Sequence, residues 1–125
     1  MGDIKFQGNP ELIEIIGEEI DNKFLAAIKE LSLSPDVIER HKDLKIVYTP
    51  IHGTGVKLVP DSLRNYGFTN IIHVPEQDIP SGDFPTVESP NPENASAMAM
   101  AVAKAKEVEA DLVVASDPDA DRCAV

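Results

Sequence analysis

The fold is decided near the end of the chain, by the stretch Glu109-Ala-Asp-Leu-Val-Val-Ala-Ser-Asp-Pro-Asp-Ala-Asp-Arg122. Its apolar run, residues 112–115, is short and contains two valines, which is typical of a buried strand. Three aspartates at alternate positions follow the strand, and Arg122 comes directly after them. Carboxylates this close repel one another. A chain that folds around them therefore needs a cation or basic groups beside them.

Two more strands are predicted upstream of this stretch. Residues 44–49 are rich in β-branched and aromatic side chains and end at Pro50, and residues 70–74 form a similar short run. Helices are expected between the strands, over residues 56–66 and over the alanine-rich residues 95–110. Because strands joined through helices need crossover connections, we expect the three strands to lie parallel in one sheet.

The expected fold is therefore a single α/β domain with three αβα layers, in which crossover helices cover a mixed, mostly parallel sheet. The α/β core is expected over residues 44–125, and residues 1–40 are expected to form a helical lead-in. A further strand, antiparallel to residues 112–115, is expected to begin at Cys123.

The lead-in is expected to be mostly helical. Apolar residues at helical spacing predict a helix from Pro10 onward, and an apolar stripe continues from residue 21 to about residue 31. Ser34 is the predicted cap of a short helix that ends at Arg40. Before these helices, the apolar residues of segment 4–6 indicate either a short edge strand or an incoming linker.

A proline-rich loop is predicted over residues 75–94, and a loop of this length in a small domain is more often functional than idle. Asn91 is the predicted N-cap of the alanine-rich helix, with Pro92 at its first position. In parallel sheets, the loops that follow the strands gather at one edge, which is the usual ligand side. The residues 52–53 and the residues 117–121 are both expected to face that edge.

Composition limits the possible functions. The chain has 125 residues, 42% of them hydrophobic, which fits one globular domain. It carries 11 Lys and Arg against 22 Asp and Glu, a formal net charge of -11, which argues against nucleic acid as a partner. No apolar run approaches the ~20 residues that cross a bilayer, and the first residues do not resemble a secretory signal. With a single cysteine, these features predict a cytoplasmic protein without a membrane partner.

The aspartate loop has three interpretations. Three short carboxylates that converge would offer Mg²⁺ or Ca²⁺ the oxygen ligands that these ions prefer. The spacing also resembles the start of a calcium-binding helix-loop-helix, but Arg122 occupies the position that needs glycine there. A solvated acidic turn is the remaining interpretation. The preceding strand and Arg122 favour a site, because a metal and a guanidinium together can share the charge of a bound phosphate.

Two motifs resemble one enzyme family. The sequence Ser116-Asp-Pro-Asp-Ala-Asp-Arg122 resembles the metal-binding loop of the α-D-phosphohexomutases, the phosphoglucomutase and phosphomannomutase superfamily. The sequence Thr49-Pro-Ile-His-Gly-Thr-Gly55 resembles the entrance to the second domain in that family, in particular among phosphoglucomutase-like members. The order of elements matches from about residue 40 to the end. The resemblance covers only the second of four domains.

This resemblance implies an activity and its cofactor. In the family, a phosphoserine in the first domain exchanges its phosphoryl group with a hexose phosphate, through a bisphosphorylated sugar. Asp117, Asp119 and Asp121 would hold Mg²⁺, and the catalytic Arg122 would lie near the phosphoryl group. The phosphoserine segment and the sugar-binding loops of the other domains are not found in the chain. We therefore expect a fragment, residues 1–125, that depends on the other domains of the same chain to bind hexose phosphate and is inactive alone.

Other residues are of types that often carry out catalysis, but each has a simpler structural interpretation. His52, in a strand-to-helix turn, is more often a structural hydrogen-bonding residue than a catalyst. The glycines of residues 53–55 are expected to serve the turn, because the chain contains no nucleotide-binding fingerprint. His73 is given no role, and Cys123 is expected to be a small buried strand residue. The alternative function is a stand-alone acidic α/β module that binds a metal or a protein without phosphoryl transfer.

Overall fold

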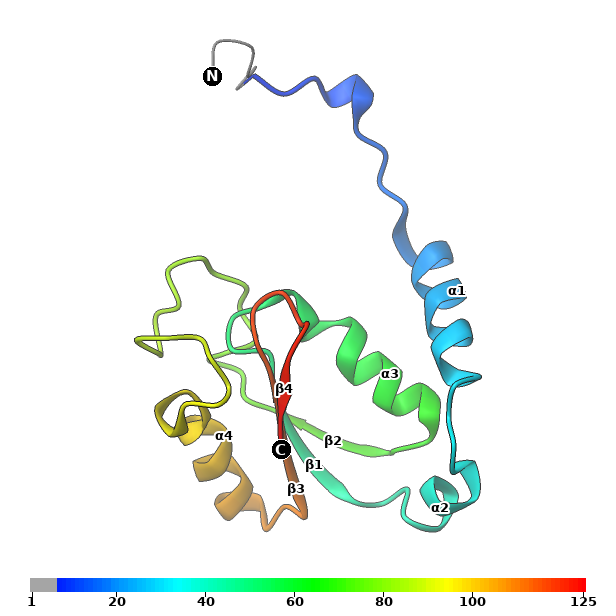
Figure 1. Ribbon diagram of the computed structural model, residues 1–125, viewed down its shortest axis with the longest axis vertical. Helices are drawn as coiled ribbons and strands as arrows, with labels where there is room; N and C mark the ends of the chain where they lie inside the picture. Colours follow the sequence, from blue (N-terminus) through cyan, green and yellow to red (C-terminus); the bar gives the residue numbers. More distant parts are fainter. Residues whose placement is uncertain (1–6) are drawn as a thin grey trace.

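A four-stranded sheet with the order β2-β1-β3-β4 forms the centre of the molecule (Figure 1). The structure is a computed structural model and describes residues 7–125, so the predicted strand or linker at residues 4–6 lies outside the described residues. Three of the strands are parallel, as predicted, and the short fourth strand is antiparallel to β3. The strands are β1 (Lys45–Thr49), β2 (Asn70–His73), β3 (Leu112–Ser116) and β4 (Cys123–Ala124).

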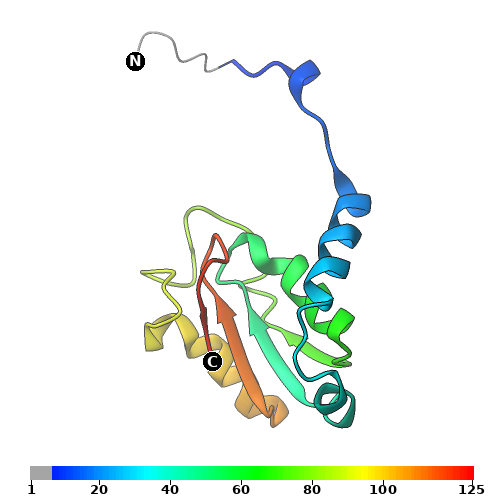
Figure 2. The same ribbon diagram turned by 45° about the vertical axis from the view of Figure 1, so that its right-hand side comes forward.

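Helices cover both faces of this sheet, which confirms the three-layer αβα prediction. The helix α4 (Ala95–Val108) packs on β1 and β3, and α3 (Leu58–Tyr66) lies on the other face with α1 (Gly17–Lys29) against it. Figure 2 shows α1 running beside α3 on the side of the sheet away from α4. None of the helices within residues 7–125 combines the length and the apolar character needed to span a membrane.

The main core lies between α4 and the sheet. Ala97, Ala101 and Ala105 recur every four residues, so they form one row on the helix surface, and all three are buried. Small side chains allow the helix to approach the strands closely. Two of these alanines pack in separate clusters, Ala101 with Val47 and Ala97 with Ala115.

The start of the lead-in differs from the prediction. The residues Pro10–Leu12 form only a 3-10 turn, capped by the Asn9 side chain, and α1 begins at Gly17. The predicted helix from Pro10 is wrong over residues 13–16, because these exposed residues pack on nothing in the described chain and three of the four are isoleucines, which favour extended backbone. Gly17 has a φ of 52°, a left-handed conformation that separates this segment from the helix.

Two helix caps also differ from the prediction. The helix α2 (Pro35–Arg40) forms as predicted, but the Ser34 side chain makes no capping hydrogen bond. The prediction that α4 begins at Asn91 and Pro92 is wrong, since the helix begins at Ala95. The side chain of Asn91 accepts a hydrogen bond from the Glu93 backbone N–H at 3.0 Å, and this closes a separate turn before the helix.

Candidate metal centre

The aspartate loop connects β3 to β4 at the carboxyl edge of the sheet. The Arg122 backbone N–H donates to Asp117 Oδ1 at 3.1 Å, and the Asp117 N–H donates to the Arg122 carbonyl at 3.2 Å. Ala120 adopts a left-handed conformation, with φ of 60°, and its N–H donates to the Asp117 carbonyl at 3.0 Å. The loop is therefore a tight hairpin turn that is organised by Asp117.

The three aspartates predicted as metal ligands come together in this loop. One carboxylate oxygen from each of Asp117, Asp119 and Asp121 lies within 4.8 Å of the others. Asp117 is only 1% exposed, whereas the other two are open to solvent. A cation could therefore reach the cluster from the exposed side.

Arg122 neutralises part of this charge. Its Nε lies 2.7 Å from Asp117 Oδ2 and 3.6 Å from Asp121 Oδ1. The sequence did not predict that the arginine would bind Asp117, because the hairpin that brings residue 122 back to residue 117 is a tertiary feature. Its side chain remains 53% exposed, so it is not enclosed by the loop that it stabilises.

The pKa values of the aspartates follow from these contacts. Burial acts to raise the pKa of Asp117, but hydrogen bonds from the Arg122 side chain and backbone outweigh it, so this pKa is lowered. The pKa of Asp121 is raised, first by its hydrogen bond with Asp117 and then by the charges of Asp119 and Asp117. The pKa of Arg122 is raised by its hydrogen bond to Asp117. The remaining repulsion between carboxylates therefore acts mainly on Asp121, on the solvent-exposed side of the loop.

The donor set fits a hard divalent cation. Three carboxylates and one guanidinium leave two negative charges uncompensated within the cluster. All of the offered atoms are oxygens, which Mg²⁺ and Ca²⁺ prefer over nitrogen or sulfur. The residues present therefore suit a metal of this class, and ligation by these aspartates remains a prediction.

The turn that follows β1 supports the aspartate loop from one side. The Thr54 N–H donates to the Pro118 carbonyl at 2.8 Å, and the Thr54 hydroxyl donates to the same oxygen at 3.1 Å. Gly53 is so close that a Cβ there would lie 2.4 Å from Pro118 Cα. The two loops expected at one edge of the sheet are thus in direct contact, and Gly53 is needed for close approach.

His52 is a structural hydrogen-bonding residue, as the sequence indicated. It is buried, and its Nδ1 and Nε2 lie 2.8 Å from the Ile79 carbonyl and from Thr86 Oγ1, respectively. A carbonyl only accepts, so Nδ1 carries the proton in this contact. Both ring nitrogens are used to hold the loop between β2 and α4, which leaves neither for a substrate.

The same loop contains a buried polar residue that the sequence did not identify. Gln77 is fully buried, and its Oε1 accepts from the Thr49 hydroxyl at 2.7 Å while its Nε2 donates to Thr86 Oγ1 at 3.1 Å. Its backbone carbonyl accepts from the His52 N–H at 2.9 Å. A glutamine in a proline-rich stretch has no sequence signal that marks it as buried.

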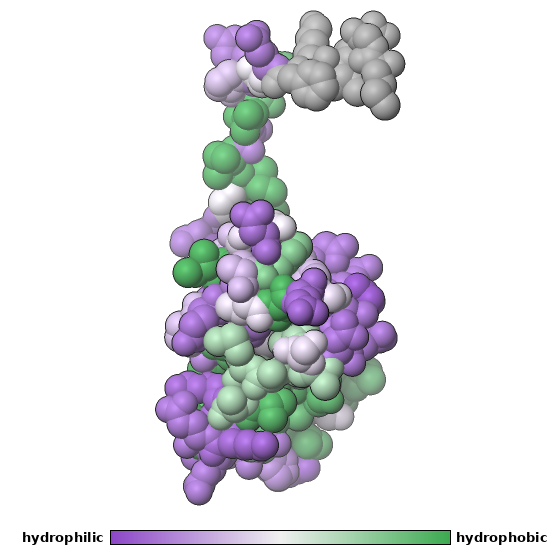
Figure 3. Space-filling view, turned by 90° about the vertical axis from the view of Figure 1, so that its left-hand side faces the viewer, coloured by the Kyte–Doolittle hydropathy of each residue, from purple (hydrophilic) through white to green (hydrophobic). Residues whose placement is uncertain are grey.

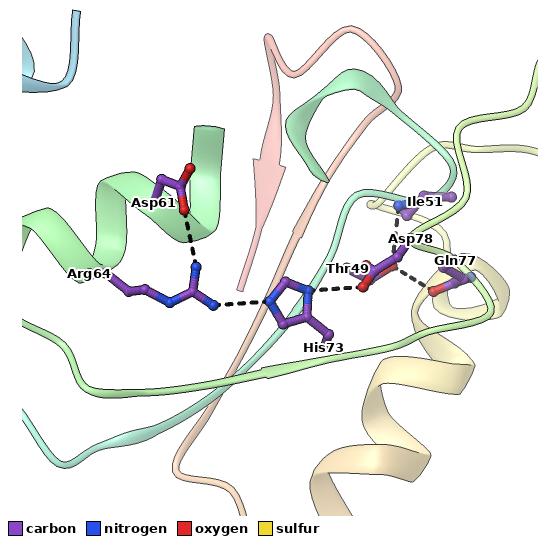
Figure 4. A network of polar contacts seen from close by, with 7 residues as sticks. All are labelled: Thr49, Ile51, Asp61, Arg64, His73, Gln77 and Asp78. Atoms are coloured by element: carbon purple, nitrogen blue, oxygen red, sulfur yellow. Dashed lines mark hydrogen bonds and ion pairs between the residues drawn. The ribbon is translucent and has the colours of Figure 1, made fainter. Parts of the chain in front are cut away.

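His73 also has partners that the sequence did not reveal. Figure 4 shows a chain of contacts from Arg64 through His73 to Asp78. The His73 Nδ1 lies 2.9 Å from Asp78 Oδ2, and its Nε2 lies 3.3 Å from an Arg64 nitrogen. This chain links α3 to the start of the loop, so His73 has a structural role after all.

The prediction that Cys123 is buried is wrong. The sequence led us to expect a small buried strand residue, but the Cys123 side chain is exposed. The reason is that β4 is a two-residue edge strand, which no helix of the described chain covers on the outside.

The fold and the carboxylate loop define a class of protein, an α/β/α domain with an acidic site at the carboxyl edge of its sheet. Comparison with known proteins identifies the family. The family model for phosphoglucomutase/phosphomannomutase, alpha/beta/alpha domain II, matches residues 22–125. The chain therefore belongs to the phosphoglucomutase/phosphomannomutase family and is its domain II, as the two motifs indicated.

Curated relatives agree with this assignment. A phosphomannomutase of Mycoplasmoides pirum is 34% identical over 125 residues, which are 100% of this chain and 23% of the relative. A phosphoglucomutase of Staphylococcus saprophyticus is 36% identical over 110 residues, 88% of this chain and 19% of the relative. A probable phosphoribomutase of Schizosaccharomyces pombe is 49% identical over 84 residues, 66% of this chain and 14% of the relative. The chain thus spans less than a quarter of the length of these relatives, and no solved structure matches it significantly.

Proposed function

We propose that this domain is the magnesium-binding domain of a phosphohexomutase. The parent enzyme would interconvert hexose 1-phosphate and hexose 6-phosphate through a phosphoserine and a bisphosphorylated sugar intermediate. Membership of the family supports this proposal, and so do relatives that are named phosphomannomutase and phosphoglucomutase. We propose a phosphoglucomutase-like enzyme, on the basis of the motif over residues 49–55.

The observation that carries the proposal is the convergence of three carboxylate oxygens within 4.8 Å at the carboxyl edge of the sheet. Asp117, Asp119 and Asp121 would hold Mg²⁺. When bound, this ion would neutralise the charge on the phosphoryl group during transfer. The buried Asp117 would fix the position of the site, and the exposed Asp119 and Asp121 would complete it.

Arg122 would contribute to the same charge compensation. Its Nε is used in the ion pairs with Asp117 and Asp121, while its terminal nitrogens have no hydrogen-bond partner within residues 7–125. These N–H groups could therefore donate to a phosphoryl oxygen while Nε still orients Asp117. Donors that are held in place before the reaction stabilise developing charge without reorganisation.

The other elements of the reaction would come from outside this domain. We propose that the remaining domains of the parent chain supply the phosphoserine and bind the hexose phosphate, so that residues 1–125 alone are inactive. The proposed location of the enzyme is the cytoplasm, in keeping with a sequence that contains one cysteine.

The function is tested with the full-length gene product and the substitution Asp119→Asn. We expect Mg²⁺-dependent mutase turnover to fall by ~100-fold or more, the scale of removing one electrostatic contribution to a transition state. Asp119 makes no hydrogen bond within the described chain, so the free energy of unfolding should change by less than about 0.5 kcal/mol. The matched control is Asp36→Asn, at an exposed aspartate of α2, which should leave turnover unchanged.

Two results would contradict the proposal. Unchanged turnover in Asp119→Asn would remove the metal role of the loop. A gene that encodes neither a serine-bearing domain before this one nor further domains after it would favour the alternative, a stand-alone acidic module that binds a metal or a protein.

A further inference from the structure

The Pro118 carbonyl is the main point of contact between the turn after β1 and the aspartate loop. It accepts two hydrogen bonds from Thr54, one from the backbone N–H at 2.8 Å and one from the side-chain hydroxyl at 3.1 Å. A carbonyl oxygen has two lone pairs, so Thr54 alone uses its acceptor capacity. The Pro118 carbonyl is therefore held by the protein and is not free to serve as a further ligand of a metal ion.

These two hydrogen bonds act on the direction in which Asp119 points. The Pro118 oxygen belongs to the planar peptide group that joins Pro118 to Asp119, so fixing this oxygen fixes the whole group. The proline ring already limits φ of residue 118 to about −65°. Because the peptide that follows the proline is also held, the backbone that leads into Asp119 has little rotational freedom left.

Asp119 depends on this support more than the other two aspartates do. The Arg122 Nε lies 2.7 Å from Asp117 Oδ2 and 3.6 Å from Asp121 Oδ1, so both of these side chains are restrained by the arginine. The Asp119 side chain is exposed and has no ion pair or hydrogen bond within residues 7–125. The contact from Thr54 to the Pro118 carbonyl is therefore the restraint closest to this carboxylate.

The sheet itself builds this contact. The strands β1 and β3 are adjacent and parallel, and their register pairs Thr49 with Ala115, so the loops that follow them leave the sheet side by side. Gly55 of the turn also meets the aspartate loop, because a Cβ there would lie 2.9 Å from Ser116 Oγ. The segment before α1 extends away from the domain and takes no part in this contact (Figure 3). The turn after β1 thus supports the residues on both sides of Asp117.

We propose that Thr54 is a positioning residue of the candidate metal centre, which raises the affinity for a divalent cation by orienting Asp119 through the Pro118 peptide. This inference rests on the proposed function, because it takes the aspartate loop to be the site of the ion. A ligand that is already oriented loses less conformational freedom on binding, and the affinity rises for that reason. Thr54 itself is not a ligand, since its hydroxyl hydrogen bonds to the carbonyl.

The chain offers a matched control for Thr54. Thr69 also donates two hydrogen bonds to one carbonyl, that of Lys42, from its backbone N–H at 2.8 Å and from its hydroxyl at 3.0 Å. Both threonines are exposed. Thr69 directly precedes β2, so it lies at the edge of the sheet opposite to the aspartate loop. The substitutions Thr54→Val and Thr69→Val therefore remove the same kind of hydrogen bond at the two ends of the sheet.

The test titrates the full-length protein with Mn²⁺, an ion that also takes carboxylate ligands, and measures the free ion by electron paramagnetic resonance. Binding that disappears in Asp119→Asn is counted as binding at the aspartate loop. We expect the Kd for Mn²⁺ to rise ~10-fold in Thr54→Val, the lower end of the effect of losing an outer-shell partner of a metal site. The variants Thr54→Ser, which keeps the hydroxyl, and Thr69→Val should bind like the unaltered protein.

Three results would overturn the inference. The first is an unchanged Kd in Thr54→Val. The second is an equal loss of affinity in Thr69→Val, since that loss would come from general destabilisation. The third is a Thr54→Ser variant that binds as weakly as Thr54→Val, because the hydroxyl would then not be the cause.

The outcomes also separate the positioning role from the function. Mutase turnover of the unaltered full-length protein with Mg²⁺ is measured in parallel. Turnover together with an unchanged Kd in Thr54→Val refutes only the positioning role. Binding of Mn²⁺ at the loop without turnover refutes only the proposed function, and no binding at the loop of the unaltered protein refutes both.

Discussion

At the scale of single residues, Gly53 joins the two loops at the carboxyl edge of the sheet. The substitution Gly53→Ala would place a Cβ 2.4 Å from Pro118 Cα and 2.6 Å from its carbonyl oxygen. Both atoms are main chain, so the aspartate loop itself must move. We expect the free energy of unfolding, measured by urea denaturation, to fall by about 1–3 kcal/mol.

The control for this prediction is Gly82→Ala. A Cβ at Gly82 would meet nothing within 4 Å, so a change below about 0.5 kcal/mol is expected. Equal losses in the two variants would mean that the contact between Gly53 and Pro118 does not limit stability.

Tyr48 makes the stability of the domain sensitive to alkaline pH. Its hydroxyl lies 2.8 Å from Ser116 Oγ in the fully buried part of the sheet. Burial raises the pKa of Tyr48, and the hydrogen bond with Ser116 opposes this only in part. The folded state therefore keeps the phenol neutral at a pH where the unfolded chain, with its ordinary pKa of about 10, already ionises. Stability present below pH ~10 is lost as the pH rises towards the higher pKa of the folded state.

The variant Tyr48→Phe tests this dependence. At pH 7 it should lose about 1 kcal/mol of unfolding free energy, because one buried hydrogen bond is removed. Between about pH 9 and pH 11 its stability should fall less steeply than that of the unaltered chain. The control Tyr66→Phe removes the other tyrosine hydroxyl and should keep the alkaline loss due to Tyr48. Parallel pH profiles for all three proteins would show that Tyr48 is not the sensitive group.

At the scale of elements, the long loop between β2 and α4 is held by buried polar contacts rather than by an apolar core of its own. Gln77 connects Thr49 of β1 to Thr86 in the interior of the loop, and His52 also contacts Thr86. In Figure 4 Gln77 points from the loop towards the end of β1. The loop is therefore fixed to the strand end that positions the aspartate loop.

Replacing the buried amide tests this role. In Gln77→Met, the hydroxyl of Thr49 loses its acceptor, and we expect a loss of about 1–3 kcal/mol in the free energy of unfolding. Limited proteolysis should cut within residues 78–94 more rapidly. The matched variant Glu76→Met changes an exposed neighbour and should alter neither measurement. Resistance to proteolysis that is the same in both variants would contradict the anchoring role.

The elements that the sequence predicted correctly are those with a strong local pattern. The strands and α3 were predicted correctly because β-branched runs and apolar residues at helical spacing are patterns that lie within one short segment and indicate which of its faces is buried. The lead-in was wrong over residues 13–16, where isoleucines at helical spacing have no surface to pack on in the described chain. The start of α4 was wrong because Asn91 and Asn94 are both good cap residues, and only the turn closed by Asn91 decides between them.

At the scale of the whole molecule, the domain places three aspartates at the carboxyl edge of its sheet, and we expect a metal there to need further ligands from outside the domain. The formal net charge is -11, and Arg122 already forms ion pairs with two of the three aspartates at the site, Asp117 and Asp121. We expect residues 1–125 to bind Mg²⁺ weakly, with a Kd of ~10⁻³ M or higher, because Mg²⁺ sites usually need substrate phosphate in addition to carboxylates. At ten times that Kd, Mg²⁺ should stabilise the domain by about 1.4 kcal/mol.

This effect is measured as a shift in thermal unfolding on titration with MgCl₂. Sodium chloride at equal ionic strength is the control, because screening alone stabilises a chain of high net charge. The variant Asp119→Asn should abolish the difference between the two salts. Micromolar affinity for Mg²⁺ in the unaltered domain would contradict the prediction, because it would mean that the site is complete without a phosphate.

The sequence by itself determined the α/β class, the parallel direction of three strands, the family and the position of the three aspartates after a strand, because local patterns and short motifs carry this information. Only the tertiary structure decided that Arg122 pairs with Asp117, that Gln77 and His52 anchor the long loop, that Cys123 is exposed and that apolar side chains of α1 are exposed. The Arg122–Asp117 pair depends on how one loop turns, and the other features depend on how segments that are separate along the chain pack or fail to pack against one another. A pattern within one segment reports how that segment is buried, but it does not report which partner buries it.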